Sequence, residues 1–402
     1  MLETIRQDFP ILNQEVHNKP LIYLDSAASA QKPQSVIDSM LYYYQHDNAN
    51  VHRGAHTLGD RATHSFEAAR DTVQAFLNAP SRKEIIWTKG TTEAINLIAN
   101  GLSGLFTKGD EIIVSGMEHH ANIVPWQMMA ERTGAVLRVL EINDQGELDH
   151  AQLIELINPK TKVLAMTHVS NVLGTINPVK QFIDTAKASN IITVIDGAQA
   201  VPHFKVDVQA LDCDFYAFSS HKLFGPTGLG VLYGKTDRLE AMPPYQGGGE
   251  MIERVSFSGT TFNQLPYKFE AGTPPICEAI GLKAAIDYLE AQDREKIEAH
   301  EQALLKRAEE LANNIPGMRV IGTSKTKVPV MSFLIEGLHP SDIGTLLDQQ
   351  GIGIRTGHHC AMPLMERFEI PGTARASFAF YNTLEEVDTL FTALAKIQRM
   401  FV

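Results

Sequence analysis

Short apolar runs and longer helical patterns alternate along residues 20–274. The short runs are rich in β-branched residues and are typical of buried strands, whereas the longer segments have the periodicity of helices. Strands that alternate with helices favour crossover connections, and hence a mostly parallel sheet with both faces covered. The expected strands are Leu21–Asp25, Ile85–Thr88, Glu111–Ser115, Val136–Ile142, Lys162–Thr167, Ile191–Asp196, Phe215–Ser219 and Gly230–Tyr233. The helices expected between them include Thr92–Leu102 and Ala121–Arg132.

The pattern changes after about Pro274. A long helical stretch with a break near Asp293 is followed by shorter strands and helices, which is typical of a smaller α+β domain. We therefore expect a large domain over residues 20–274 and a smaller one over residues 275–402, with residues 1–19 packed beside the smaller domain. The elements expected after the change are helices at Ile276–Asn314, Ser341–Gln350 and from Leu384 onward, and strands at Met318–Gly322, Val330–Ile335 and Arg375–Phe380.

Composition narrows the classes of function. The 402-residue chain has a formal net charge of −12, and an acidic protein repels a phosphate backbone, so we expect no nucleic-acid partner. No apolar stretch is long enough for a membrane span, and no apolar run follows a basic cluster near the N-terminus as in a secretory signal. The three cysteines, Cys213, Cys277 and Cys360, contain no CxxC pair. This pattern favours a cytoplasmic protein without a disulfide framework or a structural metal site.

Polar residues follow several predicted strands, at the edge of an open α/β sheet where ligands bind. Gly90, Thr91, Thr92 and Glu93 come after the strand IIWT and open a helix. Free backbone N–H groups and the helix dipole suit an anion there, and Thr92 can add a hydroxyl group. Such a segment is also an ordinary helix cap when it occurs alone.

Asp196 and Lys222 suit a cofactor with a pyridine ring and a carbonyl group. A carboxylate at the end of a buried strand needs a cationic or hydrogen-bonding partner, and the pyridinium nitrogen of pyridoxal phosphate would be one. Lys222 leaves a half-buried strand for a glycine-rich turn, where desolvation lowers the pKa of its amine and makes it nucleophilic. Taken alone, Asp196 would be interpreted as a helix N-cap and Lys222 as a surface lysine. Together with the segment 90–93, they favour a cofactor site.

Two histidines lie between the strand EIIVS and the next helix. The imidazole of His119 can stack on a flat cofactor and exchange protons near neutral pH. The alternative is a histidine that caps the helix or sits satisfied in the core. We expect that plainer role for His120.

Cys360 lies in the polar segment RTGHHCA at residues 355–361, where a thiol is accessible. An arginine and two histidines nearby favour the reactive thiolate, whereas Cys213 and Cys277 occur in apolar or helical surroundings typical of packing residues. Adjacent residues such as those in HHC rarely converge on one metal, so we expect none here. Arg375, on a later strand, suits a bidentate grip on a carboxylate, and its alternative is a surface ion pair.

Long motifs through nearly the whole chain resemble one family. In family order they are GTTEAINL, MEHHANIVPW, THVSNVLGTINP, VIDGAQAV, SSHKLFGPTGLG, FEAGTP and RTGHHCAMPLM. They resemble the SUF-type (SufS-like, group II) cysteine desulfurases, also called cysteine desulfurase/selenocysteine lyases. The resemblance implies an α/β fold of the pyridoxal-phosphate-dependent transferase type I, as in aspartate aminotransferase. It also implies a homodimer and a role in iron–sulfur cluster assembly.

The resemblance also implies roles for individual residues. The Schiff-base lysine of the family matches Lys222, and its persulfide-forming cysteine matches Cys360. The acid at the pyridine nitrogen matches Asp196, the contact to the phenolic oxygen matches Gln199, and the ring-stacking histidine matches His119. These residues would let the enzyme take sulfur from L-cysteine, release L-alanine and hold the sulfur as a persulfide on Cys360. A SufE- or SufU-like acceptor protein, together with a SUF scaffold, would receive it.

The resemblance also indicates which residues bind the cofactor phosphate and the substrate. The phosphate grip matches Thr92, Ser219 and His221, with Thr91 close enough to share it. Thr273, in FEAGTP, resembles the threonine that reaches the phosphate bound by the partner subunit. The residues matched to the substrate carboxylate or placed near Cys360 in sequence are Asn171, Arg375, Arg355 and His358.

Two departures and two rival functions accompany this resemblance. Some relatives have glycine in place of Ser220, and the stretch VSFSGTTF is slightly shorter than in some relatives. A short segment around RTGHHCA fits the SUF branch better than the housekeeping branch, whose loop is longer. The nearest rival is an aminotransferase of the same fold, which would not need Cys360. A non-catalytic scaffold or carrier-binding protein is the rival from another class, and intact Lys222, Asp196 and Cys360 oppose it.

Overall fold

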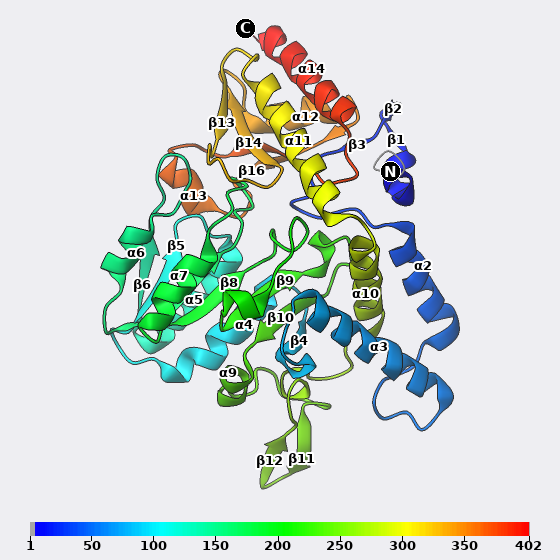
Figure 1. Ribbon diagram of the computed structural model, residues 1–402, viewed down its shortest axis with the longest axis vertical. Coiled ribbons are helices and arrows are strands. Elements are labelled where there is room, and N and C mark those ends of the chain that lie inside the picture. The colour runs from blue at the N-terminus through cyan, green and yellow to red at the C-terminus, as the bar shows by residue number, and fades with distance from the viewer. Residues whose placement is uncertain (1–4, 402) are drawn as a thin grey trace.

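A computed structural model describes residues 5–401 and has a seven-stranded sheet at the centre of a large domain (Figure 1). The strands are β4 (Ile85–Thr88), β5 (Glu111–Ser115), β6 (Val136–Leu140), β7 (Thr161–Thr167), β8 (Ile192–Asp196), β9 (Phe215–Ser219) and β10 (Gly230–Gly234). Their order across the sheet is β4-β10-β9-β8-β7-β5-β6. Strands β5 to β9 are parallel, and β10 is antiparallel to both of its neighbours. The expected mixed, mostly parallel sheet is confirmed.

Helices cover both faces of this sheet because each strand sends alternate side chains to opposite sides. Ile86 and Ile112 pack in one hydrophobic core, whereas Ile85 and Ile113, one position away, pack in the other. The helices that contribute to the first core are α4 (Thr91–Leu102), α5 (Val124–Thr133) and α9 (Thr236–Ala241). Those that contribute to the second are α2 (Gln34–Tyr42), α3 (Thr57–Phe76), α6 (His150–Leu156), α7 (Val179–Ala188), α8 (Val208–Leu211) and α10 (Ile276–Glu290), with Ile297 from the first turn of α11 (Arg294–Ala312).

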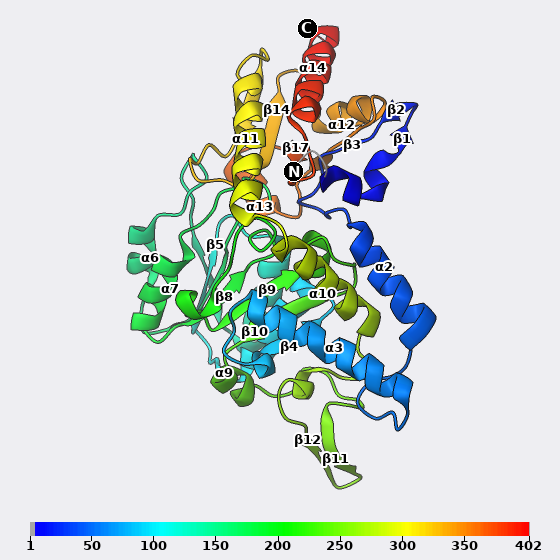
Figure 2. The ribbon, with the colours of Figure 1, turned by 45° about the vertical axis from the view of Figure 1, so that its right-hand side comes forward.

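A four-stranded antiparallel sheet forms the smaller domain. Its strands, in spatial order, are β13 (Met318–Ile321), β14 (Val330–Ile335), β17 (Thr373–Ser377) and β16 (Arg355–Gly357). The helices of this part are α11 (Arg294–Ala312), α12 (Pro340–Asp348), α13 (Met362–Arg367) and α14 (Leu384–Phe401). Figure 2 shows α11, α12 and α14 gathered around the sheet. Leu304, Ile343 and Leu390, one from each of these three helices, share its hydrophobic core.

The packing divides the chain differently from the expected boundary at residue 274. Helix α10 packs against α2 and α3 and belongs to the core of the large domain, so the change of domain falls between α10 and α11. At the other end of the chain, β3 (Ile22–Tyr23) pairs in parallel with β15 (Ile352–Gly353) of the small domain. These differences arise because apolar periodicity identifies a helix but not the surface that it covers.

The N-terminal segment lies across the junction of the two domains. The ring of Phe9 contacts Tyr288 of the large domain as well as Phe380 and Tyr381 of the small one. Arg6 pairs with Glu386 of α14 at 2.7 Å. Residues 1–4 and 402 belong to the expected small domain but lie outside the described residues.

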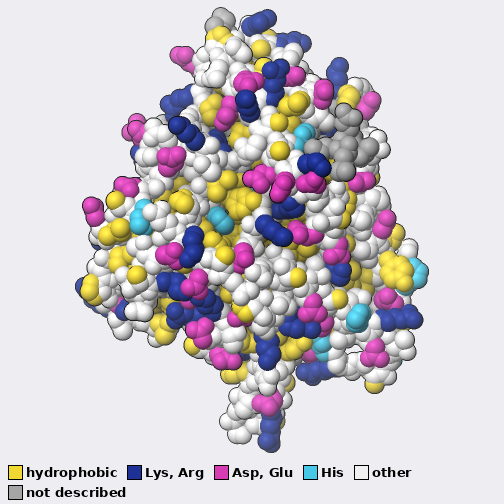
Figure 3. All heavy atoms as spheres, viewed as in Figure 1, with side chains coloured by type: hydrophobic (Ala, Val, Ile, Leu, Met, Phe, Trp, Pro, Cys, Tyr) yellow, Lys and Arg dark blue, Asp and Glu magenta, His cyan; other side chains and the backbone are white. Residues whose placement is uncertain are grey.

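Two short hairpins complete the fold. They are formed by β1 (Glu15–Val16) with β2 (Lys19–Pro20), and by β11 (Ile252–Ser256) with β12 (Gly259–Phe262). The second hairpin protrudes from the large domain in Figures 1 and 2, and Phe257 at its tip is exposed. Figure 3 shows acidic and basic side chains interspersed over one face of the molecule. No helix within residues 5–401 is both long and apolar enough to cross a membrane.

A buried ion pair attaches the segment before Thr273 to the large domain. Arg70 of α3 is fully buried and donates to both carboxylate oxygens of Glu270, at 2.7 and 2.9 Å. The Glu270 carboxylate also accepts the backbone N–H of Trp87, on β4, at 2.8 Å. Burial by itself lowers the pKa of the Arg70 guanidinium, but the Glu270 carboxylate raises it by more. The pKa is therefore above its ordinary value, and Arg70 stays charged.

We expect Arg70→Met to lower the free energy of unfolding by about 3–5 kcal/mol, because it leaves the Glu270 carboxylate buried without its cation. Urea unfolding followed by circular dichroism measures this change. The double variant Arg70→Met with Glu270→Gln is the control, and it should recover part of the loss because no unpaired charge remains. Equal destabilisation in the single and double variants would contradict this account of the ion pair.

Candidate active site

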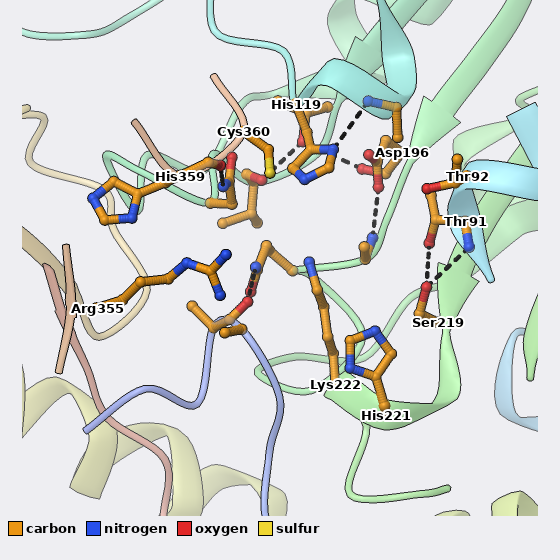
Figure 4. A pocket seen from close by; sticks show the side chains of 18 of the residues that line it. Thr91, Thr92, His119, Asp196, Ser219, His221, Lys222, Arg355, His359 and Cys360 are labelled. Atoms are coloured by element: carbon orange, nitrogen blue, oxygen red, sulfur yellow. Dashed lines mark hydrogen bonds between the residues drawn. The ribbon is translucent and has the colours of Figure 1, made fainter. Parts of the chain in front are cut away.

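A cavity opens at the carboxyl ends of β8 and β9, between the two domains. Its volume is about 180 Å³, and residues of both domains line it. In Figure 4, Lys222 lies between the group Thr91, Thr92 and Ser219 on one side and Cys360 on the other. The predicted site residues that line this cavity are Thr91, Thr92, His119, Asn171, Asp196, Gln199, Ser219, His221, Lys222, Arg355, Cys360 and Arg375.

One end of the cavity is built for an anion. Thr91 begins α4, and its backbone N–H and its hydroxyl group both contact the Ser219 hydroxyl, at 2.9 and 2.8 Å. The start of the helix approaches β10 so closely that a Cβ at Gly230 would lie 2.3 Å from the Cα of Gly90. Glycine at 230 therefore permits the position of this helix end, whose dipole favours a phosphate group.

Lys222 follows β9 in a short 3-10 helix, Ser220–Lys222. Burial lowers the pKa of its amine to about 8, although the Asp196 carboxylate acts in the opposite direction. About a tenth of the amine is thus uncharged at pH 7, far more than for an ordinary lysine, and the uncharged form is what a nucleophile or proton acceptor requires. Burial also lowers the pKa of His221 to about 4, with the Lys222 charge adding to the effect, so this imidazole is neutral.

Asp196 ends β8 and is buried, 5% exposed. Its carboxylate accepts the backbone N–H of Ala198 at 2.9 Å, and burial raises its pKa. A cation placed in the cavity would stabilise this carboxylate. Gln199, one turn further on, donates from Nε2 to the carbonyl oxygen of Ala27 at 2.7 Å and has a second N–H for a ligand.

The protonation state of His119 follows from its surroundings. Nδ1 accepts the backbone N–H of Ala121 at 3.0 Å, so the proton of the neutral ring is on Nε2. Burial and the nearby Lys222 charge lower the pKa of this imidazole to about 3. His119 is therefore a neutral histidine that can donate from Nε2 into the cavity.

Arg375 offers a carboxylate-binding group that is already held in place. One terminal nitrogen donates to the carbonyl oxygen of Asn171 at 2.9 Å, and the other donates to Asp25 at 3.0 Å. Its Nε is buried without a hydrogen-bond partner among the described residues. Arg355, exposed at the rim, adds a second positive charge to this end of the cavity.

Cys360 enters the cavity from the small domain, on the loop between β16 and α13. Both His359 and Cys360 have left-handed backbone angles, with φ of 53° and 57°, although neither is glycine. Such residues persist only where surrounding contacts hold them, and they cluster at functional sites. His359 does not supply the positive charge expected beside the thiol, because burial lowers its pKa to about 3 and keeps it neutral.

The other two thiols are unsuited to chemistry. Cys213 is buried, and burial raises its pKa to about 12. Cys277 is 2% exposed on α10, and burial also raises its pKa. Neither lines the cavity, in agreement with the packing role that their sequence context indicates.

The residues present fit pyridoxal phosphate. The helix start with Thr91, Thr92 and Ser219 suits its phosphate, and the buried Asp196 carboxylate suits a pyridinium nitrogen. The amine of Lys222 lies in the same cavity, between the group Thr91, Thr92 and Ser219 on one side and Cys360 on the other (Figure 4). Within residues 5–401, no group of three or more His, Cys, Asp or Glu side chains is arranged to bind a metal ion.

One predicted site residue does not line this cavity, and some residues that support the site were not predicted. Thr273 is exposed and lines a separate pocket with Trp87, Glu93 and Tyr245, so its predicted role toward a partner subunit stays a prediction. Asp25, which accepts a hydrogen bond from Arg375, was missed, although it ends the apolar run LIYLD in the sequence.

Glu118 was also missed, although it precedes His119 in the motif MEHH. It accepts the N–H of Thr167 at 2.7 Å and the Asn122 amide at 2.7 Å, and burial raises its pKa to about 8. These bonds attach the segment that carries His119 to β7. Its signal was a carboxylate inside a buried apolar context, which needs polar partners.

Comparison with known proteins identifies the family. The sequence matches aminotransferase class-V over residues 22–390. A probable cysteine desulfurase of Vibrio cholerae serotype O1 is 52% identical, covering 98% of this chain and 98% of its own length. A cysteine desulfurase of Pectobacterium carotovorum is also 52% identical, covering 99% of this chain and 98% of its own length.

Solved structures agree with the sequence matches. The crystal structure of the cysteine desulfurase CsdA (S-sulfonic acid) from Escherichia coli has a TM-score of 0.93 at 43% identity and covers 100% of this chain and 99% of that chain. The apo cysteine desulfurase of Thermococcus onnurineus NA1 has a TM-score of 0.95 at 40% identity, with coverages of 99% and 98%. The expected fold class is confirmed, and pyridoxal phosphate is the cofactor of this fold. The chain therefore belongs to the class-V aminotransferase family, among its cysteine desulfurases.

Proposed function

We propose that this protein removes sulfur from L-cysteine with pyridoxal phosphate, releasing L-alanine and leaving a persulfide on Cys360. The observation that carries the proposal is that Lys222, Asp196 and Cys360 line one cavity, although the thiol comes from the other domain. An aminotransferase of the same fold has no use for a thiol at this position. The high identity to cysteine desulfurases over the full chain supports the same choice.

The chain's own groups suit each part of the reaction. Bound pyridoxal phosphate supplies an electron sink for chemistry at the substrate α-carbon. Lys222 Nζ is partly uncharged near pH 8 and takes the α-proton of the substrate. The buried Asp196 carboxylate would stabilise the positive charge of a pyridinium nitrogen. Arg375 Nε binds the substrate carboxylate. The protonated Lys222 amine returns this proton, and His119 donates a hydrogen bond from Nε2 in the neutral form that its surroundings impose.

The sulfur transfer balances without an external oxidant. The Cys360 thiolate attacks the substrate sulfur, an S–S bond forms, and the carbon–sulfur bond breaks with its electron pair passing to carbon. Two protons then reach the carbon skeleton, so L-cysteine and the Cys360 thiol become L-alanine and the Cys360 persulfide. The substrate carbon is reduced by the same two electrons that oxidise the sulfur.

The test is to add L-cysteine to the purified enzyme and to measure alanine, sulfide and the mass of the Cys360 peptide. We expect alanine in step with sulfur released to a thiol reductant, and one added sulfur atom on that peptide before reductant is supplied. Formation of pyruvate and ammonia, or of a keto acid from an amino-group transfer, would sink the proposal. The Cys213 and Cys277 peptides serve as internal controls.

We further propose that the protein is of the SUF type and supplies sulfur for iron–sulfur cluster assembly in the cytoplasm. The short loop between β16 and α13 supports the SUF branch, because the corresponding loop of the housekeeping branch is longer. A SufE- or SufU-like acceptor would take the persulfide sulfur and pass it to a SUF scaffold. Selenocysteine lyase activity is a second function that the same cavity suits, since selenium differs from sulfur mainly in leaving more readily.

The homodimer is also a proposal, and the position of Thr273 supports it. Lys89, Glu93 and Tyr245 line both the Thr273 pocket and a surface pocket at Thr91 and Thr92. Thr273 is thus exposed beside the anion end of the cavity without entering it. A second copy of the chain packed on this surface would place its own Thr273 against the phosphate. Light scattering measures the mass of the protein in solution and tests this arrangement.

A further inference from the structure

The loop that carries Cys360 is fastened to the large domain by His120. The backbone N–H of His120 donates to the carbonyl oxygen of Cys360 at 2.7 Å. Its ring nitrogen Nε2 accepts the backbone N–H of Met362 at 3.0 Å. One residue therefore makes two hydrogen bonds across the junction, one on each side of Ala361.

These contacts require a neutral ring in one tautomer. Because Nε2 accepts a hydrogen bond, the ring proton is on Nδ1. Burial and the facing His358 lower the pKa of the imidazole, which keeps it neutral. The His120 and His358 ring centroids are 5.7 Å apart, and His358 Nδ1 accepts the N–H of Cys360 at 3.1 Å. His120 thus holds the loop from the large domain, and His358 stabilises the loop from within.

The loop needs such support. Two consecutive non-glycine residues, His359 and Cys360, have left-handed backbone angles that are unfavourable without stabilising contacts. The large domain makes one further side-chain bond to the loop, from Asn171 Nδ2 to the carbonyl oxygen of His359 at 2.8 Å. Contacts between residues of the loop do not attach it to the large domain, which holds Lys222. The hydrogen bonds of His120 and Asn171 make that attachment.

We propose that His120 is a positioning residue for sulfur transfer, holding the loop His358–Met362 so that the Cys360 sulfur stays over the substrate. The inference deepens the proposed function and rests on it for the identity of the transferred atom. His120 itself does not line the cavity, so it acts through the loop and not on the substrate. It is distinct in this from His119, the adjacent histidine that does line it.

Three variants separate the side-chain bond from the bulk of the ring. His120→Leu and His120→Asn both remove the acceptor at the Nε2 position. The leucine side chain is apolar, and the asparagine side chain is too short to reach the N–H of Met362. His120→Gln places its Oε1 near that position and restores an acceptor. A matched control is His150→Leu, because His150 is also half-buried and also makes a hydrogen bond through Nε2, with the Thr185 hydroxyl group at 2.7 Å, but lies on α6 outside the cavity.

Hydrogen exchange of the cofactor-loaded enzyme tests the clamp without any turnover. We expect the amides of residues 358–362 to exchange about tenfold faster in His120→Leu and His120→Asn, the loss of one hydrogen bond, and about as in wild type in His120→Gln and His150→Leu. Unchanged protection in both acceptor-free variants would overturn the proposal. If His120→Leu does not fold, as judged by cofactor absorbance, the smaller polar change in His120→Asn decides the result.

Single-turnover sulfur transfer tests positioning. After mixing with L-cysteine, the sulfur added to the Cys360 peptide should form about 10- to 100-fold more slowly in the two acceptor-free variants, as expected for a misplaced reacting group. His120→Gln should stay within about fivefold of wild type. A looser loop with an unaltered rate would overturn positioning. Absence of added sulfur in wild type would instead refute the proposed function, and the exchange result would still decide the clamp.

Discussion

Lys222→Ala should lose turnover of L-cysteine by at least about 10⁴-fold, because no other amine lines the cavity within residues 5–401 to move the substrate proton. The same variant should lose the visible absorbance of lysine-bound pyridoxal phosphate. Burial lowers the pKa of Lys222 to about 8 and so prepares the amine for both roles. Absorbance spectroscopy and alanine release measure the two effects independently.

Lys327→Met is a matched control for this experiment. Lys327 is 3% exposed, and burial lowers its pKa to about 8 as it does for Lys222, but its amine donates to the carbonyl oxygen of Gly322 in the small domain. The control should keep the cofactor absorbance and turnover, which shows that burial alone does not make a catalytic lysine. A Lys222→Ala enzyme with a normal visible band would refute the assignment.

Cys360→Ala should lose sulfur release from L-cysteine by at least about 100-fold while keeping the cofactor absorbance. The thiol enters the cavity from the small domain, so its removal leaves Lys222 and Asp196 in place. Mass spectrometry should find no added sulfur on the corresponding peptide. Alanine and sulfide assays complete the measurement.

Cys213→Ala and Cys277→Ala are the controls, since both thiols are buried outside the cavity. Added sulfur on either of these residues in wild type would overturn the assignment of the nucleophile. Full activity of Cys360→Ala toward another amino acid would favour the aminotransferase alternative. The same variant tested with selenocysteine measures how far selenium release depends on the thiol.

The sequence allowed the anion end and the lysine of the cavity to be predicted because both depend on local order. Strands β4 and β9 have the predicted bounds, and the polar residues that follow them lie at one edge of the sheet. Fully buried parallel strands are short apolar runs, so the polar residue that ends each run is easy to recognise. A polar residue that directly follows a parallel strand therefore lies at the carboxyl edge of the sheet.

Contacts between distant segments could not be predicted in this way. The bond from Met362 to His120 joins residues 242 positions apart, and nothing in the motif MEHH distinguishes a clamp from an ordinary cap. Asp25 pairs with Arg375 across 350 positions for the same reason. Helix α10 was placed in the wrong packing unit because its apolar residues are spread around it and suit either partner. Long-range partners have no local signal.

The pairing of β3 with β15 means that the small domain is not one continuous stretch of chain. A fragment cut between α10 and α11 would carry β15 with a bare edge, and such an edge invites pairing between molecules. Residues 22–25 would have to travel with that fragment for it to remain monomeric, since Leu24 and Ser377 also exchange backbone hydrogen bonds with their neighbours across this seam. Residues 22–25 thus tie the thiol-bearing half to the lysine-bearing half, and a division of the protein would respect this topology only if these residues stayed with the small domain.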